Sequence, residues 1–131
     1  MNRVAITGIG IMSPIGCDPK TVTASLLEGV SGIGRIEGLD TAGLGTDIGA
    51  EVRDFDPSAY FDRRDARRMD RFSQLSMAAA VSAYGDSGLN EGTYEPGMCG
   101  SYIGSGIGGM KTLEEEHKKL LDELAGKVNV R

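Results

Sequence analysis

Apolar residues recur at helical spacing in three stretches of the sequence. The first starts at Asp18 or Pro19 and runs to about Leu27, with Gly29 as its stop. The second starts at Asp70 and runs to Gly85 and Gly88, and its core-facing positions are Phe72, Leu75, Ser76, Ala79, Ala80 and Ala83. A helix covered in alanine and serine can pack on nearly every side, so we expect this one in a middle layer. The third stretch, residues 110–124, predicts a charged helix that ends near Gly126.

Other stretches have the pattern of strands. Residues 3–6 form a β-branched apolar run, residues 47–52 alternate between apolar and polar positions, and residues 98–103 form a further apolar run. We expect a loop over 31–45, turns at 56–60 and 91–96, and the start of another strand at 128–130. Strands separated by helices predict an α/β fold. The length of 131 residues suits one domain or a piece of a larger one, and no boundary or repeat divides it.

Glycines gather before the third helix. Gly104, Gly106 and Gly109 match G-x-G-x-x-G between a predicted strand and a predicted helix. This spacing is typical of a phosphate-binding loop, the wall of a substrate pocket, or a tight turn. A dinucleotide site also needs an acidic residue about 20 positions on, at the end of a strand. Asp122 and Glu123 fall inside the predicted helix instead, which disfavours that reading. A second G-x-G, at 8 and 10, leads to Pro14 and not to a helix, so we expect no phosphate site there.

Composition and charge exclude several classes of protein. The chain has 20 glycines and a net charge of −5, and the negative charge argues against nucleic-acid binding. Cys17, Cys99 and His117 provide neither a disulfide framework nor the spacing of a metal site. The sequence shows no signal peptide and no run of 18 apolar residues. We therefore expect a soluble, cytoplasmic protein without a membrane segment.

The most charged stretch is 62–71, which contains three aspartates among its arginines. One interpretation is a solvated helical turn with internal Asp–Arg pairs, each contributing about 0.3–0.5 kcal/mol. The other is a docking surface for an acidic partner. The charge pattern alone leaves both open.

Several separated blocks of the sequence resemble the β-ketoacyl-acyl carrier protein synthases, especially the type II elongating enzymes. The blocks follow one another in order along essentially the whole chain: residues 3–16, Gly29 to Ile33, Arg67 to Phe72, Asp86 to Leu89, and Gly104 to Gly109 with Glu114 to His117 after it. The resemblance implies a thiolase-like fold of alternating αβαβα layers. It also implies that residues 1–131 are the N-terminal part of a ketosynthase domain about three times as long, and so less than its first half.

In that family the catalytic cysteine, two histidines and lysine lie beyond the stretch that this chain matches. None of them has a counterpart here, so we expect no catalytic residue in the chain and no acyl-enzyme from it. Cys99, at the start of a predicted apolar strand, is expected to be a small buried residue. The family position that matches Cys17 is not the nucleophile, and His117 is expected on a solvated helix face.

The resemblance assigns binding roles to two groups of residues. Gly106, Ile107 and Gly108 match the turn that approaches the acyl tunnel, where Ile107 would border the far end and limit chain length. Arg64, Arg67 and Arg68 match the docking surface for the acidic acyl carrier protein. The implied substrates are acyl and malonyl thioesters, the implied assembly of the full-length enzyme is a homodimer, and no metal or redox cofactor is implied. The alternatives are a type II polyketide ketosynthase, its chain-length-factor subunit, or a non-catalytic carrier-binding module.

Overall fold

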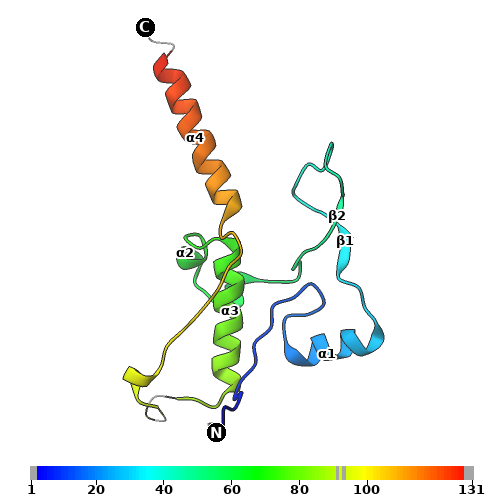
Figure 1. Cartoon of the computed structure of the whole chain (residues 1–131), viewed down its shortest axis with the longest axis vertical. Coiled ribbons are helices and arrows are strands. Elements are labelled where there is room, and N and C mark those ends of the chain that lie inside the picture. The colour runs from blue at the N-terminus through cyan, green and yellow to red at the C-terminus, as the bar shows by residue number, and fades with distance from the viewer. Residues whose placement is uncertain (1–2, 91, 93, 129–131) are drawn as a thin grey trace.

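The computed structural model of the chain describes residues 3–90, 92 and 94–128 (Figure 1). Four α-helices, two short strands and two 3-10 turns follow one another along it. In order they are α1 (Pro19–Glu28), β1 (Ile33–Arg35), β2 (Ile48–Ala50), η1 (Pro57–Ala59), α2 (Arg63–Ala66), α3 (Arg71–Asp86), η2 (Pro96–Met98) and α4 (Met110–Val128). Figure 1 shows α3 in the centre, α4 extending away beyond its N-terminal end, and α1 with the β1–β2 hairpin to one side.

The helices begin and end where local chemistry predicts. Asp18 caps α1 by accepting a hydrogen bond from the amide of Thr21 at 2.9 Å, and Gly29 ends the helix in the left-handed region with φ 68°. Asp56 caps η1 in the same way through Ser58. Helix α3 continues through Gly85 to Asp86, with the left-handed Gly88 just beyond, so Gly85 is not the stop that we predicted.

Two of the predicted strands are absent from the described residues. Within the described part of the chain, residues 3–6 are unpaired, residues 99–103 follow η2 without a partner strand, and the only sheet is the antiparallel pair β1–β2, with Ile33 opposite Ala50. A strand needs a neighbour to satisfy its backbone, and the described residues offer none to these two segments. The prediction at 47–52 is confirmed at β2, whereas the loop predicted over 31–45 is wrong at β1. The described part is therefore helical with one small sheet, not yet the layered α/β structure expected.

The N-terminal segment lies directly against α3. A Cβ on Gly10 would lie 2.7 Å from the amide nitrogen of Ala83, and one on Gly8 would lie 2.6 Å from that of Ser87. The amide of Ile9 between them donates to Oδ2 of Asp86 at 2.9 Å. The glycines at 8 and 10 therefore permit backbone to meet backbone, which explains a G-x-G that precedes no helix.

The buried core of the described residues is small. Of the residues that the structure describes, only Phe55, 7% exposed, and Ala78, fully enclosed, are buried, while Val4 is 95% exposed and Met77, Val81 and Tyr84 of α3 are about half exposed. Helix α3 is thus buried at Ala78 and partly covered elsewhere, and the described residues do not supply the cover on nearly every side that we predicted. Its accessible surface of 10912 Å² compares with about 6,600 Å² for a compact protein of 13.8 kDa.

Helix α4 reaches the C-terminal end of the described residues. Val128 is the last residue of α4, and the rest of the strand predicted at 128–130 lies outside the described residues. Within the described part of the chain, none of the helices combines the length and the apolar character needed to cross a bilayer.

Candidate functional site

The arginines predicted to dock a partner are exposed on and just after α2. Asp62 caps this one-turn helix, because its Oδ1 accepts from the amides of Arg64 and Asp65 at 2.9 and 2.8 Å. We call Arg64, Arg67 and Arg68 the arginine surface; all three side chains are exposed, as is that of Arg63. Within residues 62–71, all described, no ion pair joins an aspartate to an arginine. The prediction of internal Asp–Arg pairs is therefore wrong, and these positive charges face solvent.

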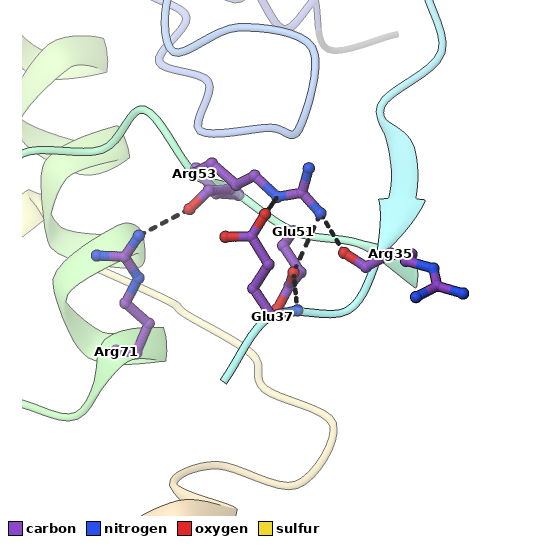
Figure 2. Close-up of polar contacts among 6 residues, drawn as sticks. Arg35, Glu37, Glu51, Arg53 and Arg71 are labelled. Carbon is purple, nitrogen blue, oxygen red and sulfur yellow. Dashed lines mark hydrogen bonds and ion pairs between the residues drawn. The ribbon is translucent and has the colours of Figure 1, made fainter. Parts of the chain in front are cut away.

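Arg71, the next arginine, has a different role. It donates to the carbonyl oxygen of Val52 at 2.7 Å (Figure 2). Its guanidinium carbon also lies 4.8 Å from the centre of the Phe55 ring. These contacts tie the first turn of α3 to the segment after β2 and cover one of the two buried residues. We conclude that Arg71 stabilises the fold and is not free to bind a partner.

Next to Arg71, a set of charged side chains connects the two strands of the hairpin. Arg53 lies 3.3 Å from Glu51 and 3.8 Å from Glu37, and it donates to the carbonyl oxygen of Arg35 (Figure 2). Glu51 also accepts from the amide of Glu37 at 2.9 Å. Exposed pairs of this kind contribute only about 0–1 kcal/mol each, so this network sets the register of the hairpin more than it stabilises the chain.

The glycine turn depends on two glycines. Gly108 has φ 79°, in the left-handed region, and its amide donates to Oγ of Ser105 at 2.9 Å. Gly109 lies against Asp70, whose carboxylate occupies the place of a side chain. By contrast, a Cβ on Gly104 or Gly106 would meet nothing within 4 Å. The G-x-G-x-x-G letters thus include only one of these two glycines, Gly109, and miss Gly108.

A groove of about 620 Å³ lies between the start of α3 and the start of α4. Its apolar lining comes from Met69, Phe72, Leu75 and Met110, and Gly108 and Gly109 form part of its wall. Ile107 is not in the lining; its side chain is 77% exposed. The glycine turn and the arginine surface therefore lie at the same end of α3, with this groove beside them.

The residues considered for covalent chemistry are dispersed. Cys99 is exposed, not buried as predicted, because the segment that contains it pairs with no strand among the described residues. Cys17 is half-buried, and His117 is exposed on α4, as predicted. Among the described residues, no hydrogen bond joins either cysteine to a histidine or a lysine, and no group of three or more His, Cys, Asp and Glu side chains could hold a metal ion. Asp122 and Glu123 lie on α4, as expected, and not at the end of a strand.

Sequence reasoning missed one contact of the site. Oγ1 of Thr112, in the first turn of α4, donates to Oδ1 of Asp70, which precedes α3. The two residues are 42 positions apart, and no periodicity or motif connects them. The only available signal was that Asp70 suits a helix N-cap, which would have predicted a local bond instead.

Comparison with known proteins identifies the family. The model of the family described as "Beta-ketoacyl synthase, N-terminal domain" matches residues 1–130. The "3-oxoacyl-[acyl-carrier-protein] synthase 2" of Staphylococcus aureus strain COL is 43% identical over 92% of this chain and 29% of its own length. Its namesake from Vibrio harveyi is 40% identical over 97% of this chain and 31% of its own length.

Among solved structures, "The ishigamide ketosynthase/chain length factor" is similar, with a TM-score of 0.60 and 38% identity over 66% of this chain and 21% of that chain. The chain spans about three tenths of the length of the curated relatives it matches. Because the family match covers residues 1–130, this chain belongs to the β-ketoacyl synthase family and corresponds to its N-terminal domain.

Proposed function

We propose that this chain is the N-terminal part of a synthase that condenses an enzyme-bound acyl thioester with malonyl-acyl carrier protein. The reaction forms a carbon–carbon bond, releases carbon dioxide, frees the enzyme thiol and leaves a 3-oxoacyl chain longer by two carbons on the carrier. The observation that carries the proposal is the family match over residues 1–130, together with relatives named 3-oxoacyl-[acyl-carrier-protein] synthase. The nucleophile and its base would lie in the remaining length, consistent with the dispersed cysteines and histidine here.

The contribution of this domain would be binding and not chemistry. Arg64, Arg67 and Arg68 are exposed and unpaired with the nearby aspartates, so they are available to an acidic carrier protein. Positive side chains on an open surface increase the rate of encounter with an acidic partner. Gly106, Ile107 and Gly108 would form part of the acyl site, because the exposed Ile107 side chain is free to face a ligand or another segment.

The proposed complete fold is the thiolase-like layered structure, in which the unpaired segments 3–6 and 98–103 would gain neighbouring strands. The enzyme would act as a homodimer in the cytoplasm without a resident metal or redox cofactor. The 38% identity to a ketosynthase/chain length factor favours a second candidate, a ketosynthase or chain-length-factor subunit of a type II polyketide system. A ketosynthase nucleophile in the remaining length would exclude a chain-length factor and a non-catalytic carrier-binding module.

The arginine surface provides the test. Reversing Arg64, Arg67 and Arg68 to glutamate in the full-length synthase should raise KM for carrier-bound substrate, while activity on a small thioester analogue stays nearly unchanged. The attraction is electrostatic and exposed to solvent, so salt should weaken it. When salt shortens the Debye length from about 10 Å at 0.1 M to about 3 Å at 1 M, the KM of the parent enzyme for carrier-bound substrate should rise most of the way to that of the variant. Steady-state kinetics on both substrates at both salt concentrations measure the effect.

A matched control separates docking from net charge. Reversing Lys20, Arg35 and Lys118 changes the total charge equally, and these three exposed side chains lie on α1, β1 and α4, away from α2. That variant should keep the parent KM. Equal losses on the carrier-bound and the small substrate would assign the arginines a structural role and contradict the docking proposal.

A further inference from the structure

Asp70 stands where an aspartate normally caps a helix, but its side chain makes no such bond. Its backbone is extended, with φ −60° and ψ 156°, as at other helix N-caps, and among the described residues no α3 amide donates to the carboxylate. Oδ1 accepts from Oγ1 of Thr112 instead. The carboxylate therefore joins the beginning of α3 to the beginning of α4, in place of a local contact.

The glycine turn packs on Asp70 and Phe72, at the start of α3. A Cβ on Gly109 would overlap the Asp70 carboxylate, and one on Gly108 would lie 3.9 Å from the ring of Phe72. Gly109 has no positive φ, so an alanine there would suit its backbone and would only displace the carboxylate. Asp70 thus contacts the first turn of α4 through one hydrogen bond, and it lies against the glycine turn at Gly109, where no side chain displaces its carboxylate.

Asp70 is also joined to the arginine surface. Nε2 of Gln74 donates to the carbonyl oxygens of Ala66 and Met69 at 2.7 and 3.2 Å, which holds the end of α2 and the following residues on α3. Arg67 and Arg68 lie between those two carbonyls in the sequence. The hydrogen bonds of Gln74 therefore join the segment that carries Arg67 and Arg68 to the first turn of α3, and Asp70 lies between that turn and Gly109 of the glycine turn.

We propose that Asp70 is a positioning residue that, through Thr112 and Gly109, holds the glycine turn on α3 and fixes Ile107 relative to the arginine surface. Asp70 contacts no substrate in this role; it sets where the docked carrier stands relative to the residue that limits chain length. The consequence for acyl selectivity rests on the proposed function. The structural part can be measured without it.

The first experiment is hydrogen exchange over residues 105–113 of the full-length synthase. Asp70→Ala, Thr112→Val and Gly109→Ala should each speed exchange of the Gly108 and Leu113 amides about three- to tenfold after correction for intrinsic rates, because one hydrogen bond has been lost. Asp70→Asn and Thr112→Ser keep an acceptor and a donor, so they should stay within about twofold of the parent. If Asp70→Ala fails to fold, Thr112→Val and Gly109→Ala decide. Unchanged exchange in those variants overturns the proposal.

The second experiment is the ratio of kcat/KM for long against short acyl primers. Asp70→Ala and Gly109→Ala should both shift this ratio at least about threefold, and in the same direction. Asp70→Asn keeps the hydrogen-bond acceptor, so it should keep the parental ratio. A purely structural role would lower the melting temperature of all variants and leave the ratio unchanged.

Ile107→Phe, measured in parallel, separates this proposal from the proposed function. It adds bulk to the acyl site and should reduce activity on long primers about 5- to 150-fold more than on short ones. A flat Ile107→Phe profile with faster exchange in Asp70→Ala removes Ile107 from the acyl site and supports the positioning contact. A shifted Ile107→Phe profile with parental selectivity in Asp70→Ala overturns the positioning role and leaves the proposed function standing.

Discussion

Gly10 lies at a position where there is no room for a side chain. The N-terminal segment lies so close to α3 that a Cβ on Gly10 would meet backbone atoms of Ala79 and Ala83, which cannot move without distorting the helix. Gly10→Ala should therefore destabilise the full-length synthase by about 1–3 kcal/mol, the usual cost of overpacking. Thermal unfolding at one fixed scan rate measures it as a lower transition temperature.

Gly45→Ala is the matched control for this substitution. Gly45 has no positive φ, and a Cβ there would meet nothing within 4 Å, so its replacement should leave the unfolding temperature nearly unchanged. If Gly10→Ala were as stable as Gly45→Ala, the segment would not lie on α3 as described.

The sequence was a better guide to residues whose structural role depends on close neighbours in the chain. A helix start at Asp18 or Pro19 and a turn at 56–60 were predicted because an N-cap bond joins residues only a few positions apart. The glycine motif indicated a turn at the right place, but it could not show that Gly108 needs a left-handed φ or that Gly109 meets Asp70. Those requirements come from α3, which lies far away in the sequence.

At the scale of elements, α1 offers a pH-dependent cap. The pKa of Asp18 is lowered by the hydrogen bond from the Thr21 side chain and then by that from the Thr21 amide. A depressed pKa in the folded state means that the cap contributes stability above the unfolded pKa and loses it as pH falls through the folded value. Thr21→Val should therefore raise the pKa of Asp18 toward the ordinary aspartate value and move the loss of the cap to higher pH.

Carbon-13 NMR titration of selectively labelled aspartate carboxyls measures this change. Asp56 is an internal control, because the pKa of its carboxyl is lowered by Ser58 in the same way and does not depend on Thr21. A Thr21→Val protein in which Asp18 titrates as in the parent would show that the side-chain bond does not lower the pKa.

Helices were more predictable than strands, of which only β2 was predicted, and the reason is physical. A helix satisfies its backbone within its own residues, so the pattern and caps of α1, α3 and α4 were sufficient to place them. Segments 3–6 and 98–103 have the residues of strands, but pairing needs neighbours that the described residues do not supply. The short β1 was missed because its three residues lie in the stretch that we predicted as a loop, whereas β2 lies within the longer alternating stretch 47–52.

At the scale of the whole molecule, the exposed surface leads to the last prediction. The chain exposes 10912 Å², roughly 4,000 Å² more than a compact protein of its mass, and the excess includes apolar side chains such as Val4, Ile6 and Met98. An excess surface of that size, part of it apolar, needs a cover, which in the proposed synthase is the remaining length of the enzyme.

The isolated chain should therefore bind the dye ANS and unfold in urea without a single cooperative transition, whereas the full-length synthase should bind little dye and unfold steeply. Dye fluorescence and urea titration followed by circular dichroism, on both proteins in one buffer, make the comparison. A steep single transition without dye binding in the isolated chain would show that its 131 residues form a self-sufficient domain, and the unpaired segments would then need no partner strands.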